Sequence, residues 1–318
     1  MPCITLARHA MATRFELVLH GDDAVHLRAA GEQALNEIDR LEDQLSLYRA
    51  HTEIADLNRR AASQPVKITP RLFSLLEHAK HLSAATNGAF DITIAPLVQC
   101  WGFMHGSGEM PDEQSLTATR SKVGMHLIEL DKSTFTVRFL REGVMLDLGA
   151  IGKGYAIQEA ADLLREAGVS SALLHGGTSS VYAIGHPPET DAWMIAIENP
   201  TTTNSPPIAT IPLKDESLSV SAVWGKSFSS SGRTYGHVLD PRTGQPASAA
   251  LLAAIVLPSA TEADAFSTAL LTLGPVGIQD ICHARPQTRA LVLFENEGRL
   301  CSEARGIDVS TYGRVSGQ

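Results

Sequence analysis

The chain is poor in cysteine and in positive charge. Its four cysteines, Cys3, Cys100, Cys282 and Cys301, lie far apart and form no CxxC pair, so their spacing indicates neither a zinc site nor a disulfide framework. The 26 lysines and arginines are outnumbered by 35 aspartates and glutamates. The net charge of -9 argues against a general nucleic-acid binder, because a phosphate backbone attracts a basic face. An anionic small ligand would therefore need local positive charge, from a metal ion or a helix N-terminus.

Long hydrophobic runs are also missing, and none approaches the length of a membrane span. The first residues, Met1 to Met11, contain Arg8 and His9 where a secretory signal would have an apolar core. The sequence as written therefore predicts a cytoplasmic protein, and a periplasmic one if a leader has been trimmed away. With 44% hydrophobic and 19% charged residues, the 318-residue chain has the composition of a globular enzyme with a sizeable core.

The most informative stretch runs from Val144 to Ala156, where an apolar run leads into a glycine-spaced turn and then a helix. Glycines let a ligand approach the backbone, and a helix N-terminus offers free N–H groups to phosphate. Asp147 and Lys153 would then face a polar ligand from opposite sides of the turn. The alternative is a strand-to-helix turn with a single ion pair. The spacing matches neither a Walker A motif nor a dinucleotide fingerprint, so other stretches have to decide.

A second concentrated stretch, from Gly232 to Pro246, contains a histidine just before strong turn chemistry. The turn Asp240–Gly244 would hold His237 in a fixed place on the preceding strand. A histidine placed in this way is a candidate general base, because its ordinary pKa lies near neutrality. A histidine that simply packs beside a turn is the alternative.

The third stretch, Ala260 to Leu270, is predicted to be helical and carries Asp264 and Thr268 one turn apart on the same face. A carboxylate and a hydroxyl together suit Mg²⁺, which takes few protein ligands and completes its octahedron with water and phosphate oxygens. The alternative is a capping box in which Thr261 and Asp264 begin the helix.

Hydrophobic periodicity predicts an amphipathic helix over 24–45 and a second helix that Thr69 caps and Pro70 begins. His78 and His81 on that helix are interpreted as surface residues without an acidic partner at metal spacing.

Asp91, between two apolar residues, needs a hydrogen-bonded role, either pinning a turn or binding a ligand. Residues 104–120 are predicted to be an exposed loop. Strand patterns occur at 14–20, 128–130, 135–139, 172–174, 193–197, 208–211, 218–223 and 290–294.

Together these stretches resemble the FAD:protein FMN transferases, the ApbE family. The matching residues follow the family's order over nearly the whole chain: Met11–Thr13, Ser46–Tyr48, Gly88–Asp91 with Trp101–Phe103, Asp147–Ala156, Gly176–Gly177, His237–Pro246 and Ala263–Thr268. The resemblance implies an α+β fold, related to the T-fold, with antiparallel sheets and packed helices. It also implies that residues 1–318 form a single domain of two interlocked lobes, with the FAD site between them.

The resemblance further implies roles for individual residues. The positions that look like FAD contacts are Met11, Tyr48, Ala89, Phe90, Asp91, Asp147, Lys153 and Val238. The positions that look like Mg²⁺ ligands are the backbone carbonyls of Ala150 and Ser267, the Asp264 carboxylate and the Thr268 hydroxyl. His237 looks like the catalytic base.

Similar proteins cleave the pyrophosphate of FAD, attach FMN through a phosphoester to a threonine or serine of an acceptor flavoprotein, and release AMP. Two other functions stay open: a Mg²⁺-dependent FAD pyrophosphatase, in which water replaces the protein hydroxyl, and an FAD-binding protein without transfer activity. The chain departs from the family pattern at four places, none of which is an expected metal ligand or the base: Ala12 for a glycine, Gln158 for a common acid, Thr178 for an amide or acid, and Ala222–Trp224 for small residues that include a Ser-Gly pair.

Overall fold

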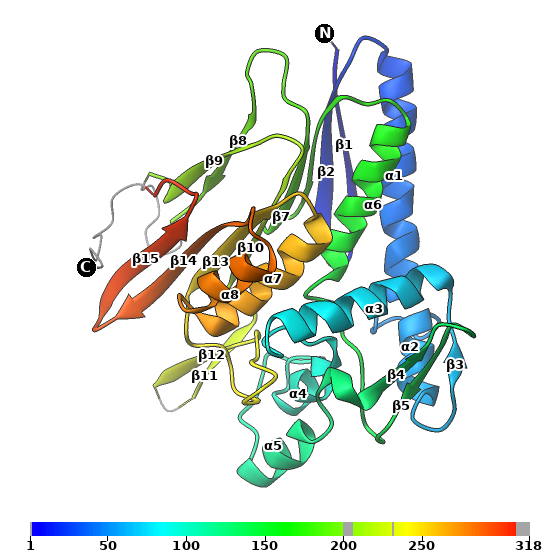
Figure 1. Ribbon diagram of the computed structural model, residues 1–318, viewed down its shortest axis with the longest axis vertical. Coiled ribbons are helices and arrows are strands. Elements are labelled where there is room, and N and C mark those ends of the chain that lie inside the picture. The colour runs from blue at the N-terminus through cyan, green and yellow to red at the C-terminus, as the bar shows by residue number, and fades with distance from the viewer. Residues whose placement is uncertain (1, 200–205, 231, 310–318) are drawn as a thin grey trace.

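A large antiparallel sheet organises the computed structural model, which describes residues 2–199, 206–230 and 232–309 (Figure 1). Its eight strands follow the spatial order β1-β2-β6-β7-β10-β13-β14-β15, and every neighbouring pair is antiparallel. Their bounds are β1 Cys3–Ala10, β2 Thr13–His20, β6 Ser171–Gly176, β7 Ser180–Ile184, β10 Ser217–Ala222, β13 Leu252–Leu257, β14 Arg289–Asn296 and β15 Arg299–Arg305. Strand β1 was not anticipated from the sequence.

The central strand β13 is buried on both faces, as its uninterrupted apolar sequence requires. Ala253, Ile255 and Leu257 face a core beneath the helices, while the alternate residues face a second core. That second core is closed by the hairpin of β8 (Trp193–Ile197) and β9 (Ala209–Leu213). The sheet therefore lies between a helical layer and a β-hairpin.

The helical layer consists of α1 (Ala24–Leu45), α6 (Gly152–Glu166) and α7 (Ala260–Leu273), with α8 (Gly277–Ala284) beside α7 (Figure 1). Helix α1 confirms the predicted range: Asp23 caps it through the N–H groups of Val25 and His26, and its apolar stripe is buried. Helix α7 corrects the predicted capping box. Ser259 is the N-cap and accepts from the N–H of Glu262, so Asp264 lies beyond the cap and is free for another role.

A second group of elements lies below this layer in Figure 1. It contains α2 (Glu53–Arg60), α3 (Pro70–Ala85), α4 (Ala95–Cys100), α5 (Glu113–Arg120), the 3₁₀ turns η1 (Ile92–Ile94) and η2 (Met125–Leu127), and a small sheet of β3 (Val66–Lys67), β5 (Thr136–Phe139) and β4 (Ile128–Asp131). Thr69 caps α3 as predicted, with Pro70 in the first turn. The predicted loop 104–120 is wrong in its second half, because Asp112 caps α5 there. The antiparallel sheets and packed helices confirm the α+β fold class.

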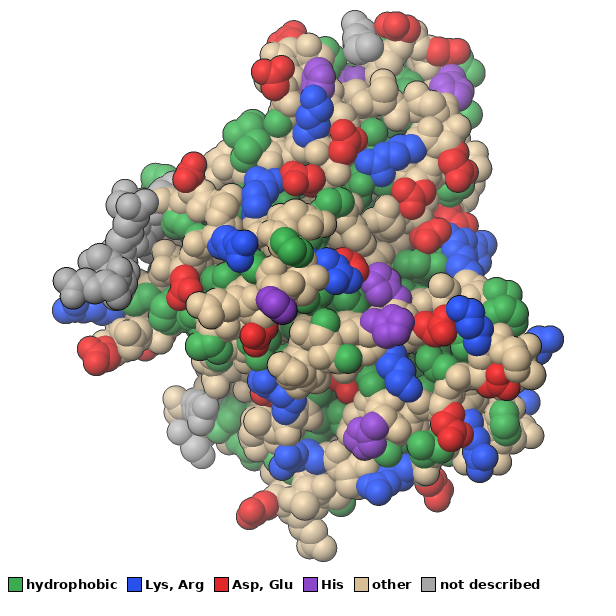
Figure 2. All heavy atoms as spheres, in the orientation of Figure 1, with side chains coloured by type: hydrophobic (Ala, Val, Ile, Leu, Met, Phe, Trp, Pro, Cys, Tyr) green, Lys and Arg blue, Asp and Glu red, His purple; other side chains and the backbone are tan. Residues whose placement is uncertain are grey.

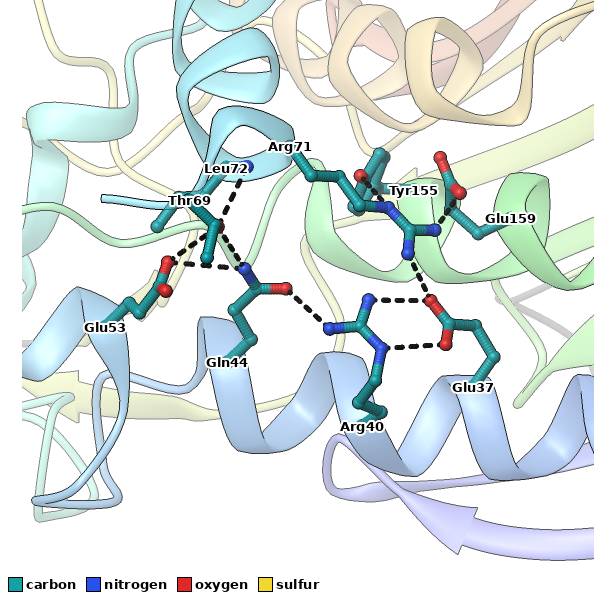
Figure 3. A network of polar contacts seen from close by, with 9 residues as sticks. All are labelled: Glu37, Arg40, Gln44, Glu53, Thr69, Arg71, Leu72, Tyr155 and Glu159. Carbon is teal, nitrogen blue, oxygen red and sulfur yellow. Dashed lines mark hydrogen bonds and ion pairs between the residues drawn. The ribbon is translucent and has the colours of Figure 1, made fainter. Parts of the chain in front are cut away.

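A polar network joins α3 to α1 and α6 (Figure 3). Arg71 of α3 donates to Glu37 of α1 and to the Tyr155 hydroxyl of α6, and it also pairs with Glu159 of α6. Arg40 binds both carboxylate oxygens of Glu37 at 2.8 and 2.7 Å. We call this set of five residues the Arg71 network. Beneath it, a continuous apolar core includes side chains of both groups of elements.

A further contact gives His78 an acidic partner on another helix. Its Nε2 lies 3.0 Å from Glu262 Oε1 of α7, and Arg285 binds the same carboxylate. Burial raises the pKa of Glu262, but the hydrogen bonds from Arg285 and His78 outweigh it and lower the pKa to about 2. His78 therefore serves helix packing.

On the face shown in Figure 2, acidic and basic side chains are interspersed, so the net negative charge does not gather there into one patch. Within the described ranges, no helix combines the length and hydropathy needed to cross a bilayer.

Candidate active site

The carboxylate of Asp264 is at the centre of the candidate site, on the inner side of α7. It is only 3% exposed. Its Oδ2 accepts the N–H of Gly154 at 2.9 Å, in the first turn of α6, and its Oδ1 lies 3.3 Å from Ser219 Oγ of β10. Lys153 Nζ is 3.9 Å from the same Oδ1. A helix N-terminus, a strand hydroxyl and a lysine thus converge on one buried acid.

Four hydroxyl groups surround this acid, and together with it they form what we call the Asp264 cluster. Ser267 and Thr268 each donate to the Asp264 carbonyl oxygen, at 3.0 and 3.3 Å. Ser221 Oγ lies 2.8 Å from Ser267 Oγ and 3.2 Å from Thr268 Oγ1, and Ser219 Oγ lies 3.2 Å from Ser267 Oγ. The structure therefore brings the predicted residues Asp264, Ser267 and Thr268 together.

Sequence reasoning missed Ser219 and Ser221. Both belong to β10, and residues two apart on a strand point to the same face, which here is the face covered by α7. The alternation of serines along this strand was the available signal. It became meaningful only when the sheet register placed β10 beneath the helix.

The donor set of the Asp264 cluster consists of hard oxygen atoms, which fits Mg²⁺ better than zinc. Among the residues that the structure describes, no group of three His, Cys, Asp or Glu side chains could hold a metal ion by itself. A cation held here would therefore rely on one carboxylate, hydroxyl or carbonyl oxygens, and groups from outside the chain. Ala150, the other expected ligand, lies half-buried in the turn just before α6.

Gly154 is required for this geometry. A Cβ at this position would come within 2.2 Å of the Ala260 carbonyl oxygen and 2.6 Å of Asp264 Cβ. The absent side chain therefore lets α6 and α7 approach until the Gly154 N–H meets the carboxylate. The glycine spacing predicted that a ligand could approach the backbone closely. In the structure, the Asp264 side chain makes this close approach to Gly154.

Asp147 and Lys153 frame the turn that leads into α6. Asp147 Oδ1 accepts the N–H of Gly149 at 2.8 Å, and Lys153 Nζ lies 3.4 Å from the Gly149 carbonyl oxygen. Burial raises the pKa of Asp147, against the opposing effects of the Gly149 N–H and the Lys153 charge. Lys153 forms its ion pair with Asp264, at 3.9 Å. The turn thus contains Asp147, while the ion pair of Lys153 reaches across to α7.

The structure shows the first of the two roles left open for Asp91, the pinning of a turn. Its Oδ1 accepts from the backbone and the hydroxyl of Thr93, at 2.8 and 2.6 Å, and its Oδ2 accepts from the Met125 N–H at 3.0 Å. The side chain thus pins the turn. Ala89 and Phe90 are buried in the main core, and the Asp147 N–H donates to the Ile92 carbonyl oxygen, which joins this segment to the Asp147 turn.

Tyr48 and Met11 lie at two other edges of the region. Tyr48 is 57% exposed, and its ring meets the edge of His105 with ring centroids 6.2 Å apart. Met11 and Ala12 form the two-residue hairpin between β1 and β2, with φ of 48° and 57°. Ala12 therefore adopts the left-handed conformation in which a glycine is more stable.

His237 follows the hairpin of β11 (Ser227–Ser230) and β12 (Arg233–Gly236). Its Nδ1 lies 3.1 Å from the Lys226 carbonyl oxygen, which accepts hydrogen bonds and cannot donate them. Nδ1 therefore carries the proton, and Nε2 keeps the lone pair that a base needs. Burial lowers the pKa of His237, with smaller contributions from the charges of Lys226 and Lys153. The histidine is thus neutral at pH 7 and electrostatically linked to Lys153.

The turn after His237 is firmly anchored, as its sequence predicted. Asp240 accepts from the backbone N–H and the guanidinium of Arg242, and Trp101 Nε1 donates to the Gly244 carbonyl oxygen at 2.8 Å. The expected FAD contact Val238 is tied into the same turn, because its carbonyl oxygen accepts the Ala247 N–H.

A large hollow of about 780 Å³ lies elsewhere, beside Asp91. Lys80, Arg120, His126 and Arg242 contribute to its lining, and neither His237 nor Asp264 does. Arg242 is already paired with Asp240, and Lys80 donates to the Ile128 carbonyl oxygen. Its cations are thus partly committed, and we place the chemistry at the Asp264 cluster and His237.

Comparison with known proteins shows the family to which the chain belongs. The model of the ApbE family matches residues 11–292. A protein of Klebsiella pneumoniae named FAD:protein FMN transferase is 30% identical over 279 residues, which cover 86% of this chain and 78% of the relative. A protein of the same name from Escherichia coli K12 is 27% identical over 91% of this chain and 83% of its own length.

Solved structures share the fold. The ApbE protein of Thermotoga maritima superposes with a TM-score of 0.84 at 23% identity, covering 97% of this chain and 96% of its own. The apo form of the flavinyl transferase ApbE of Pseudomonas stutzeri gives 0.83 at 26% identity, covering 96% and 95%. With a family match over most of its length, the chain belongs to the ApbE family and is a transferase.

Proposed function

We propose that this protein is a Mg²⁺-dependent FAD:protein FMN transferase. The observation that carries the proposal is the Asp264 cluster, a buried carboxylate ringed by hydroxyl groups beside Lys153 and an α-helix N-terminus. The names of the curated relatives support the reaction class. We also propose that residues 1–318 act as one domain of two interlocked lobes with FAD between them, which the continuous apolar core supports.

Three residues of the cluster and Ala150 would hold the metal, through the Asp264 carboxylate, the Thr268 hydroxyl and the backbone carbonyls of Ala150 and Ser267. When bound, Mg²⁺ would neutralise negative charge on the FAD pyrophosphate. Lys153 adds a fixed positive charge at the same place. FAD itself would contact Met11, Tyr48, Ala89, Phe90, Asp91, Asp147 and Val238, the buried ones of these chiefly through their backbone.

The transfer step places the acceptor hydroxyl at His237. The oxygen of the acceptor hydroxyl forms a bond to the phosphorus on the FMN side of the pyrophosphate. The bond from that phosphorus to the bridging oxygen breaks, and AMP leaves. The hydroxyl proton moves to Nε2 of His237, whose lone pair is free because Nδ1 donates to the Lys226 carbonyl oxygen. The products are a phosphoester-linked FMN on a threonine or serine, and AMP.

The proposal is tested by incubating the protein with FAD and Mg²⁺, with and without an acceptor flavoprotein domain that carries a flavinylation-type threonine motif. The control is the same domain with that threonine replaced by valine. Intact mass of the acceptor and analysis of the released nucleotides are the measurements. A covalent FMN adduct with AMP release supports the transferase. FMN and AMP without an adduct would establish a pyrophosphatase, and intact FAD would establish a carrier.

A further inference from the structure

Trp224 differs from the other two tryptophans of the chain in being exposed. Trp101 and Trp193 are 1% and 9% exposed, whereas Trp224 is 41% exposed. An exposed tryptophan keeps a large apolar surface in water, and tryptophan is enriched among the residues that carry the binding energy of protein interfaces. Its position in the fold therefore decides whether it has a partner.

That position is the rim of the His237 site. Trp224 follows Val223, whose N–H donates to the Leu251 carbonyl oxygen at 3.1 Å, and it precedes Gly225. A Cβ on Gly225 would lie 3.0 Å from His237 Cε1. The next residue, Lys226, accepts both the backbone N–H and the Nδ1–H of His237. The segment that carries Trp224 is thus the segment that lines the proposed base.

The rim segment continues into a hairpin that aromatic side chains hold in place. The β11–β12 hairpin begins three residues after Trp224 and ends one residue before His237 (Figure 1). Phe228 and Tyr235 stack across it with ring centroids 5.3 Å apart, and Trp101 lies 5.7 Å from Tyr235. An aromatic side chain on a segment held in this way loses little conformational entropy when a partner covers it.

We infer that Trp224 contacts the acceptor protein and packs against an apolar side chain next to the threonine or serine that receives FMN. The inference rests on the proposed function. An acceptor hydroxyl can reach Nε2 of His237 only if its flanking residues lie against the rim. The exposed Lys226 beside Trp224 favours an acceptor segment that is neutral or acidic around its apolar residue.

The first test uses the emission of Trp224. Because the other two tryptophans are buried, acrylamide should quench Trp224 preferentially, and a Trp224→Phe variant should lose that accessible component. Adding the acceptor flavoprotein domain, itself free of tryptophan, should protect the component from quenching. Adding FAD and Mg²⁺ without the acceptor should leave the Trp224 emission as accessible to acrylamide as before. Protection by FAD alone, or no protection by the acceptor, would overturn the inference.

The second test is kinetic and uses Trp224→Ala and Trp224→Phe. The alanine variant should raise the KM for the acceptor domain about tenfold, with kcat and the Kd for FAD within twofold of the parent, and the phenylalanine variant should recover most of the loss. Met194→Ala is the matched control, because Met194 is also an exposed large apolar residue and lies on β8. An unchanged acceptor KM in Trp224→Ala would refute the contact.

The two proposals fail in different ways. If the parent protein forms no FMN adduct on the acceptor, the proposed transferase fails, and the quenching experiment still reports whether the acceptor covers Trp224. If the parent forms the adduct but the acceptor neither protects Trp224 nor depends on it for KM, the transferase stands and the inference falls.

Discussion

The Arg71 network and the Asp264 cluster are both part-buried polar assemblies beside α6, yet they are built on opposite principles. In the Arg71 network each carboxylate has a guanidinium at close range, and the hydrogen bond from Arg40 holds the pKa of Glu37 below its ordinary value. In the Asp264 cluster one carboxylate meets hydroxyls, a backbone N–H and a lysine 3.9 Å away. Nearby, burial raises the pKa of Asp147. The opposite charges of the network are paired with one another, whereas the cluster has oxygen atoms that could bind a cation.

Stability and chemistry thus depend on different kinds of polar group in this fold. A group whose partners are already strong and complete contributes to stability, and its loss should be seen in unfolding experiments. A buried carboxylate whose partners are mainly hydroxyl groups can still form a stronger interaction with a bound ligand. Each of the following variants tests one side of this contrast.

The largest effect is expected for Asp264→Asn. The amide oxygen can still accept the Gly154 N–H, so the fold and the Kd for FAD should change little, while the charge that would hold the cation is lost. Because a bound metal supplies several kcal/mol of transition-state stabilisation, kcat should fall about 10³-fold or more. The measurement is FMN transfer as a function of Mg²⁺ concentration, with the exposed Asp280→Asn of α8 as control. An equal loss of FAD binding and turnover would contradict the role of Asp264.

The next effect is expected for His237→Ala. This variant should bind FAD and Mg²⁺ as the parent does but transfer FMN about 10²- to 10⁴-fold more slowly, the usual contribution of a positioned base. Binding is followed by flavin fluorescence and transfer by intact mass. Undiminished transfer would remove the base assignment.

The pH dependence of the parent sharpens the same assignment. Burial lowers the pKa of His237 below its ordinary value of 6.5, so the neutral, proton-accepting form persists to lower pH than for a free histidine. The transfer rate should therefore fall to half of its plateau only below pH 6.5, as the pH drops through the lowered pKa. A rate that already halves above pH 6.5 would mean that another group controls the step.

A stability effect without a catalytic one is expected for Arg71→Ala. Removing the guanidinium leaves Glu37 and Glu159 without this partner, and because Arg71 is itself partly exposed we expect a loss of about 1–2 kcal/mol in the free energy of unfolding. The control is Arg59→Ala, which breaks an exposed pair with Asp56 and should cost less than about 0.5 kcal/mol. Chemical denaturation gives the energies. If kcat fell tenfold in Arg71→Ala at a temperature where the variant is folded, the Arg71 network would serve catalysis as well as stability.

The smallest effect is expected for Ser221→Ala. It removes one hydroxyl that contacts Ser267 and Thr268, and the loss of one such hydrogen bond, about 0.5–1.5 kcal/mol, should lower kcat two- to tenfold. Ser217→Ala is the control on the same strand, because its hydroxyl bonds the Val181 carbonyl oxygen instead. Equal kcat values for the two variants would show that Ser221 plays no part in the cluster.

Much of this arrangement could be predicted from local sequence because local rules govern it. The capped helices α1 and α3 follow from their periodicity, and the proximity of Asp264 and Thr268 follows from helical spacing. The roles of Ser219 and Ser221 depend on the register of β10 and on the helix that covers it, which no local pattern contains. The capping of α7 was mispredicted because Ser259 and Thr261 are both suitable caps, and the geometry selected Ser259.

The departures from the family pattern are partly explained by contacts. Gln158 accepts the N–H of Ala260 through its Oε1 at 3.0 Å and donates through Nε2 to Asp162, so an amide joins α6 to the start of α7 in place of an acid. Ala12 takes the left-handed conformation expected of a glycine. Nothing in the structure explains Thr178.

The hydrogen bond that sets the tautomer of His237 has a consequence for natural variation. Its acceptor is a main-chain oxygen, so every amino acid at position 226 supplies it equally well, and the tautomer places no restriction on the side chain there. The neighbouring position has no such freedom. Gly225 has φ of 144°, and a Cβ there would press on the imidazole at 3.0 Å. In a saturation library scored for kcat at saturating acceptor, position 226 should therefore accept many residues and position 225 only glycine.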